Sequence, residues 1–258
     1  ARAFGVRVNT LKITTDEFIA ELGECIGIGE RIPWTSDGFY YDPFDGRGAE
    51  QPGKLPFYHA GLYYLQEPSA MYPAEQLDVK PGDKVLDLCA APGGKSTKLA
   101  AKLKGTGLLV ANDVSEERVK ALIYNLELAG VRNAVVTNEP PDRLWPNFSE
   151  YFDKILIDAP CSGLGVPGKP DARYAKTDAI IDEIAGIQKK LLDACADYVK
   201  PGGVLSAVLY SGRVIGDTEK QAVLTWLRSL PLADYTVLVC DFANWADTAP
   251  LPCLVLKK

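Results

Sequence analysis

The chain has 258 residues, of which 47% are hydrophobic and 24% are charged. This composition excludes a disordered chain, a collagen and a coiled-coil rod, and no apolar run approaches the roughly 20 residues that cross a bilayer. With 28 basic and 34 acidic side chains, a net charge of −6, the molecule as a whole does not attract phosphate.

The sequence pattern changes near residue 80, from isolated helices and turns to a regular alternation of strands and helices. Before it, helices are expected over 15–25 and 68–77, around a turn-rich aromatic segment. After it, short apolar runs alternate with amphipathic segments, a pattern typical of a doubly wound α/β sheet. We therefore predict a small α+β N-terminal extension over 1–80, which packs on a doubly wound, mostly parallel seven-stranded domain over 81–258. The strands are expected at 84–88, 107–111, 134–136, 154–157, 204–209, 235–239 and 253–256, and the helices at 95–103, 116–129, 180–199 and 218–227.

The number and spacing of cysteines and histidines indicate whether the chain has a metal site and in which compartment it lies. The six cysteines are scattered without a CxxC pair and His59 is the only histidine, so no metal site is expected. The absence of a disulfide framework and of a basic-then-apolar leader predicts a cytoplasmic protein. Cys195, Cys240 and Cys253 lie in apolar runs and are expected in the core.

The loop after the first strand of the large domain is the strongest candidate site. It consists of Cys89, Ala90, Ala91, Pro92, Gly93, Gly94 and Lys95, and it leads into a helix. Small residues let a backbone approach a ligand, and a helix N-terminus offers N–H groups.

Three interpretations of this loop compete. A nucleoside-triphosphate loop would need a glycine where Cys89 stands. A nucleoside cofactor held by its ribose needs an acid at the end of the second strand, and Asp113 lies there. The third interpretation is a plain packing turn. The ribose interpretation is favoured, and S-adenosyl-L-methionine (SAM) fits better than NAD because no G-x-G-x-x-G is present.

Four motifs carry a family resemblance. The run from Leu86 to Lys95 resembles the SAM loop of the Fmu/Sun-type RNA cytosine-5 methyltransferases. The likeness continues over about residues 6–205, in Arg7–Lys12 (RVNTLK), Tyr63–Met71 (YYLQEPSAM) and Asp158–Gly163 (DAPCSG). The resemblance implies a Rossmann-like methyltransferase fold that takes SAM as cofactor and RNA as substrate.

The resemblance also implies roles for single residues. The loop from Cys89 to Lys95 would wrap the methionine and ribose part of SAM. Asp113 would accept the ribose hydroxyls, Arg118 would support that corner, and Glu139 would lie near the adenine, where the family usually has Asp. Asp158 would face both the cofactor and the target base.

Methylation of cytosine carbon 5 needs a thiolate that adds to carbon 6. The family uses two cysteines, one in a Pro-Cys motif and a nucleophile after the fifth strand of the sheet. This chain has the first, Cys161, but two alternative alignments place Arg213 or Tyr210 at the second position. Cys161 is then a sole nucleophile, an inherited product-release group or a small buried residue, and the sequence leaves these alternatives open.

The leading hypothesis is SAM-dependent methyl transfer to carbon 5 of cytosine in structured RNA, either ribosomal or transfer RNA. The alternative is a catalytically silent SAM- or RNA-binding module of the same fold, and an NTPase is a third hypothesis. Residues 1–80 carry 7 basic and 12 acidic side chains, which predicts weak affinity for nonspecific RNA. A partner protein or a missing domain would then add the RNA affinity that this chain lacks. No membrane is expected as a partner. Tyr63 and Tyr64 either stack on bases or pack the extension onto the sheet.

Overall fold

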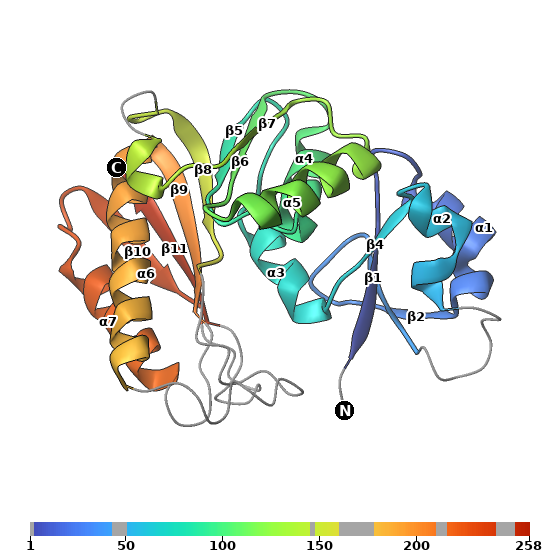
Figure 1. Ribbon diagram of the computed structural model, residues 1–258, viewed down its shortest axis with the longest axis horizontal. Coiled ribbons are helices and arrows are strands. Elements are labelled where there is room, and N and C mark those ends of the chain that lie inside the picture. Colours follow the sequence, from blue (N-terminus) through green and yellow to red (C-terminus); the bar gives the residue numbers. More distant parts are fainter. Residues whose placement is uncertain (1–2, 43–50, 145–147, 160–177, 210–215, 241–250) are drawn as a thin grey trace. The chain divides into compact units, whose positions relative to one another are not determined.

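The structure is a computed structural model that describes residues 3–42, 51–144, 148–159, 178–209, 216–240 and 251–258 (Figure 1). The strands in this part of the chain are β1 (Phe4–Val8), β2 (Ile28–Arg31), β3 (Gly38–Tyr41), β4 (Tyr63–Leu65), β5 (Lys84–Asp87), β6 (Leu108–Asn112), β7 (Ala134–Thr137), β8 (Phe152–Ile157), β9 (Val199–Leu209), β10 (Tyr235–Val239) and β11 (Leu251–Lys257). The helices are α1 (Thr15–Ile26), α2 (Pro56–His59), α3 (Pro68–Gln76), α4 (Gly94–Leu103), α5 (Glu116–Ala129), α6 (Asp178–Tyr198) and α7 (Gly216–Ser229).

The described strands form two sheets. The larger has seven strands in the order β10-β11-β9-β8-β5-β6-β7, and the smaller has four in the order β2-β3-β1-β4. Strand pairs β5–β8, β8–β9 and β6–β7 are parallel, whereas β11 runs antiparallel to β9 and β10. The predicted mostly parallel, Rossmann-like sheet with a small N-terminal α+β part is confirmed. Within the described ranges, none of the helices has the length and apolar character needed to span a membrane.

The chain forms two compact units. One comprises Ala1–Asp83 and Ala90–Asn138, and the other comprises Lys84–Cys89 and Glu139–Lys258. The division at residue 80 that the sequence suggested groups the chain differently, and it stays a prediction. In the first unit, the N-terminal elements belong together with α4 and α5, the two helices that follow β5 and β6.

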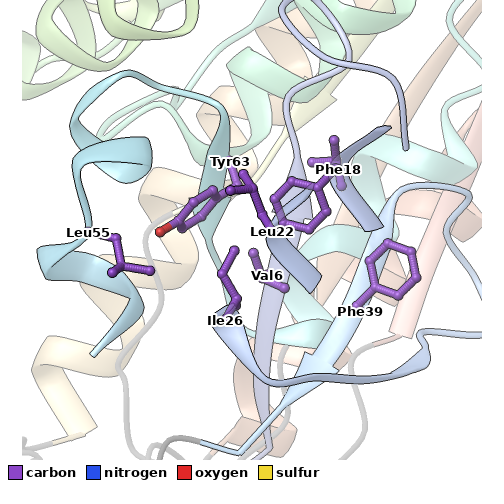
Figure 2. Packing of buried hydrophobic residues seen from close by; sticks show 8 residues of the cluster. Val6, Phe18, Leu22, Ile26, Phe39, Leu55 and Tyr63 are labelled. Atoms are coloured by element: carbon purple, nitrogen blue, oxygen red, sulfur yellow. The ribbon is translucent and has the colours of Figure 1, made fainter. Parts of the chain in front are cut away.

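The N-terminal sheet folds around its own apolar core. Strand β1 lies between β3 and β4 and pairs with both in antiparallel register. Helix α1 begins at a capping box made by Thr14 and Glu17 and ends at Gly27, whose φ of 69° suits glycine. Figure 2 shows the side chains of this core converging from the sheet, α1 and the segment before α2. The buried members of the cluster are Val6, Val8, Phe18, Leu22, Ile26, Phe39, Leu55 and Tyr63.

Helix α4 carries buried charge on the face that meets the N-terminal elements. Lys98 is 4% exposed, and its ammonium lies 2.7 Å from the carboxylate of Asp37 and 2.6 Å from that of Glu75. Lys102, one turn later, also pairs with Glu75 at 2.7 Å. Because a buried charge is stable only when it is paired, this network ties α4 to α3 and to the segment before β3.

The second unit is organised around β8 and β9. Helices α6 and α7 pack on each other and on β9 (Figure 1), and the indole of Trp226 donates to Asp193 across that contact at 2.6 Å. Asp153 on β8 pairs with Lys200 and accepts from the backbone N–H of Lys84 at 2.9 Å. Burial alone would raise the pKa of Asp153, but these partners lower it below its usual value.

Candidate functional site

The loop between β5 and α4 lies where the sequence predicted it. Leu88 continues the ladder of β5 for one residue, since its N–H donates to the carbonyl of Leu156 at 3.1 Å. The chain then turns through Cys89–Gly93, and α4 begins at Gly94. Gly93 is the N-cap residue with a φ of 111°, a conformation that side-chain-bearing residues rarely adopt. The loop therefore joins the carboxyl end of a sheet strand to the amino end of a helix, as ligand-binding turns of this fold do.

Every carbonyl oxygen from Ala90 to Gly94 accepts a hydrogen bond from the protein. The donors are the Gly93 N–H to Ala90 (2.8 Å), the Arg118 guanidinium to Ala91 (2.6 Å), the Asn125 amide to Pro92 (2.8 Å), the Thr97 N–H to Gly93 (2.9 Å) and the Arg7 guanidinium to Gly94 (2.5 Å). Carbonyl oxygens held in this way do not turn toward a ligand. The helix end that follows the loop carries the positive end of the α4 dipole, which suits an anionic group.

Two glycines allow the loop to pack between its neighbours. A Cβ on Gly93 would lie 3.3 Å from the side chains of Asn125 and Leu122 on α5. A Cβ on Gly94 would lie 3.2 Å from the side chains of Gln66 and Tyr64. The loop is therefore confined by α5 and by the end of β4, and both positions favour glycine.

Asp113, which follows β6, lies against this loop. Its side chain is 2% exposed and accepts from the backbone N–H of Ala91 at 3.2 Å and from that of Ser115 at 3.0 Å. Arg118 completes the corner, with its guanidinium 3.3 Å from the carboxylate. The Arg118 side chain is 51% exposed, so it is the only one of these partners that can leave the carboxylate without moving the backbone. The structure thus brings together the predicted residues from Ala90 to Lys95 with Asp113 and Arg118.

Three further residues support this site and were not predicted from the sequence. Arg7 and Asn125 hold the loop carbonyls, and Asn138 donates from its amide to the backbone carbonyl of Asp113 at 2.7 Å. Arg7 lies in a run that carries the family resemblance, which was its only signal. Asn125 and Asn138 look like ordinary polar residues of a helix and a strand end.

The remaining predicted residues belong to the second unit or lie outside the described ranges. Cys89 is half-buried at the end of the β5 segment, Asp158 is half-buried directly after β8, and Glu139 is exposed after β7. The two residues aligned with the family nucleophile, Tyr210 and Arg213, lie outside the described residues.

The thiols fall into distinct environments. Cys161 lies outside the described residues. Cys195 and Cys253 are buried as expected, and burial raises the pKa of Cys195 and raises that of Cys253 to about 12. The expectation for Cys240 was wrong, because it follows the last residue of β10 and stays partly exposed. Cys25 is exposed near the end of α1.

The two adjacent tyrosines have different surroundings. Tyr63 is 3% exposed in the N-terminal core, its hydroxyl donates to the carbonyl of Pro52 at 2.6 Å, and burial raises its pKa. Its ring is therefore used in packing and does not stack on a base. Tyr64 is half-buried, with its ring centroid 5.4 Å from the Arg7 guanidinium.

Known proteins resemble this chain over most of its length. Residues 74–232 match the family 16S rRNA methyltransferase RsmB/F, and residues 1–68 match the N-terminal domain of 16S rRNA methyltransferase RsmF. The ribosomal RNA small subunit methyltransferase F of Escherichia fergusonii is 36% identical over 240 residues, which make up 89% of this chain and 49% of that protein. The chain thus spans about half the length of the curated relatives it matches.

Solved structures with a similar fold support the same family. A methyltransferase homolog protein from Pyrococcus horikoshii is 29% identical with a TM-score of 0.81, over 100% of this chain and 87% of that chain. NSun6 from Pyrococcus horikoshii with SFG shares the fold with a TM-score of 0.76 at 19% identity, over 99% of this chain and 90% of that chain. The family resemblance inferred from the motifs is therefore confirmed, and the chain belongs to the 16S rRNA methyltransferase RsmB/F family.

Proposed function

We propose that this chain binds SAM and transfers its methyl group to carbon 5 of a cytosine in structured RNA. The 16S ribosomal RNA is the first candidate substrate, because the matching family and relatives are named for it. The observation that carries the proposal is the loop from Ala90 to Gly94, with all five carbonyls held by the protein and a buried carboxylate, Asp113, against its side. That arrangement suits a nucleoside ligand with an anionic end.

The Asp113 corner fits the ribose of such a ligand. A carboxylate accepts about four hydrogen bonds, and two of these positions are taken by backbone N–H groups of Ala91 and Ser115. Arg118 takes the others through one guanidinium nitrogen at 3.3 and 3.5 Å, while its second nitrogen holds the Ala91 carbonyl at 2.6 Å, so a small shift of this half-exposed group would free two positions. Two vicinal hydroxyls would then occupy the vacated positions. The loop from Cys89 to Lys95 would hold the methionine part.

The residues of the second unit complete the proposal. Glu139 would lie near the adenine, and Asp158 would face both the cofactor and the target base. Both assignments come from the family motifs, and the half-buried Asp158 directly after β8 has the position of a ligand-facing residue at a strand's carboxyl end. Each is a proposal that a single substitution tests.

When bound, SAM supplies an electrophilic methyl group. The Cys161 thiolate would add to carbon 6 of the cytosine, and Asp158, acting as a carboxylic acid, would donate its proton to the ring nitrogen that takes up the displaced electron pair. After carbon 5 has gained the methyl group, a base removes its proton and the carbon–sulfur bond breaks, which returns the thiolate. Cys161 has this role in the proposal because neither alignment offers a thiol at the second position, where Tyr210 or Arg213 stands.

The same sequence feature favours a second candidate function. A chain that kept the cofactor loop and lost the second family cysteine fits a silent SAM- or RNA-binding module as well. The two candidates differ in one outcome only, which is whether label from SAM reaches RNA.

The test is transfer of labelled methyl from SAM to 16S rRNA, to small ribosomal subunits and to transfer RNA. Wild type, Cys161→Ala and the matched control Cys25→Ala, which alters an exposed cysteine, are compared with SAM binding measured in the same preparations. We expect 5-methylcytosine with wild type and Cys25→Ala and none with Cys161→Ala. RNA containing 5-fluorocytidine should also trap wild type covalently, since the fluorine cannot leave as a proton does. SAM binding without transfer to any of these RNAs would establish the silent module instead.

A further inference from the structure

Arg7 is a buried cation with neutral hydrogen-bond partners. Its side chain lies on β1 and is 4% exposed, and burial lowers its pKa even though the nearby carboxylate of Asp37 acts in the opposite direction. The guanidinium donates to the side-chain oxygens of Gln66 and Thr97, each at 2.6 Å, and to the backbone carbonyl of Gly94 at 2.5 Å. Burying a charge among neutral acceptors is costly, so this position is poorly explained by stability alone.

The acceptors place Arg7 at the first turn of α4. Gly94 is the first residue of the helix, and Thr97 lies one turn later. The Thr97 hydroxyl itself lies 3.2 Å from the Gly94 carbonyl, so the guanidinium spans two groups that already contact each other. The planar fork of an arginine can reach both at once, whereas the single ammonium of a lysine cannot do so from the same backbone position.

Asn9 and Lys12, which follow Arg7 in the same segment, hydrogen-bond to α5 and not to α4. The Asn9 amide donates to the carbonyl of Ala129 at 2.9 Å, and the Lys12 ammonium donates to that of Leu128 at 2.7 Å. Both acceptors are in the last turn of α5, one turn beyond the loop-binding Asn125. The motif from Arg7 to Lys12 therefore attaches β1 to two helices, but of these three side chains only Arg7 contacts the loop.

We propose that Arg7 is a positioning residue of the cofactor loop, through which the N-terminal segment sets the affinity for SAM. By holding the Gly94 carbonyl, Arg7 keeps the last peptide of the loop oriented so that its oxygen points into the protein and not toward the ligand. It acts through Gly94 and Thr97 and touches no reacting atom. The inference rests on the proposed SAM site.

The test uses the full chain with Arg7→Lys and Thr97→Val, and Lys12→Met as the matched control. Lys12→Met removes an ammonium of the same segment that donates to the carbonyls of Ala60 and Leu128 and to none of the loop. Amide hydrogen exchange of residues 93–97 is measured without ligand, and the SAM dissociation constant is measured by calorimetry at a temperature where circular dichroism shows each variant folded.

We expect faster exchange of these amides and a rise in the SAM dissociation constant of about tenfold for Arg7→Lys, with a smaller rise in the same direction for Thr97→Val. Lys12→Met should change the constant by less than about twofold, because it removes no loop contact. A folded Arg7→Lys variant with wild-type exchange and wild-type affinity would overturn the inference, and if that variant does not fold, Thr97→Val decides in the same way. Failure of the wild type to bind SAM, with faster exchange still seen in the variants, would instead refute the proposed ligand and leave the positioning role of Arg7 standing.

Discussion

Replacing Asp113 by Asn tests the ribose corner most directly. The two residues have the same shape, so the change exchanges one carboxylate oxygen for an NH₂ group and removes the charge. In the structure, both oxygens are in use, one receiving the Ala91 N–H at 3.2 Å and the other the Ser115 N–H at 3.0 Å. Whichever way the amide is turned, one backbone N–H then faces a donor.

These contacts set the size of the expected losses of stability and of SAM affinity in Asp113→Asn. A buried N–H that loses its acceptor costs about 1–3 kcal/mol, which sets the expected loss of stability for Asp113→Asn. Loss of one hydrogen bond from a ribose hydroxyl to a charged oxygen costs about 1.5–3 kcal/mol, a rise of roughly 10- to 150-fold in the SAM dissociation constant. The Arg118 guanidinium also loses its ion pair with this buried carboxylate, but because the arginine itself is half-exposed this adds about 1 kcal/mol at most.

The assay is SAM titration by calorimetry together with urea denaturation followed by circular dichroism. Ser115→Ala is the control, because the Ser115 hydroxyl caps α5, where loss of the cap costs about 1 kcal/mol, while the backbone N–H that Asp113 needs is unchanged. Ser115→Ala should therefore lower stability with little effect on affinity. Wild-type affinity in a folded Asp113→Asn variant would refute the assignment of Asp113 to the ribose.

Three other predictions concern charge and thiols. Lys98→Met removes the cation that pairs with the buried Asp37 carboxylate, while Glu75 keeps Lys102, and it should lower the free energy of unfolding by about 3–5 kcal/mol in urea denaturation; a loss below about 1 kcal/mol would contradict the buried network. The partners of Asp153 lower its pKa in the folded protein. The Asp153 carboxylate therefore stabilises the fold at any pH above its pKa in the unfolded chain, near 4, and this stabilisation disappears as the pH falls through the lower pKa of the folded state. Asp153→Asn should be less stable than wild type at pH 7 and less sensitive to acid below about pH 4, and equal acid sensitivity would exclude this contribution. Iodoacetamide at pH 8 should label the exposed Cys25 in the native protein, whereas Cys253, with a thiol pKa of about 12, should react only after unfolding, as mass spectrometry can show.

Periodicity predicted the regular elements of the large sheet well, because many of their apolar residues recur at regular spacing and are buried. The helix over 116–129 and the strand over 235–239 have the predicted bounds. The strand expected at 204–209 begins at Val199 and passes through Pro201 and Gly202, with an irregular register beside β8. The N-terminal strands were not individually predicted. They have three to five residues each, and their pairing depends on partners far along the chain.

The candidate site was predictable to the extent that local rules apply. A glycine-rich turn after a strand and an acid after the next strand identified the loop and Asp113, because both features recur at fixed places in this fold. The structure brings these two together, and their roles in binding stay predictions. Arg7 and Asn125 could not be found by the same rules, since their loop acceptors lie 87 and 33 positions away in the chain. No local pattern encodes such distances.

The long separation between Arg7 and α4 has a consequence for the order in which the chain folds during synthesis. The segment from Arg7 to Lys12 is made first, yet its hydrogen-bond acceptors on α4 and α5 lie 87 to 120 positions later. The apolar cluster of residues 6–63 can collapse as soon as these residues leave the ribosome. The guanidinium of Arg7 lacks its acceptors on α4 until residue 97 has emerged, and the amide of Asn9 lacks its acceptor on α5 until residue 129 has emerged. We therefore expect the segment from Arg7 to Lys12 to stay partly open to chaperones and proteases over that interval, and its protection to be complete only when α5 has formed.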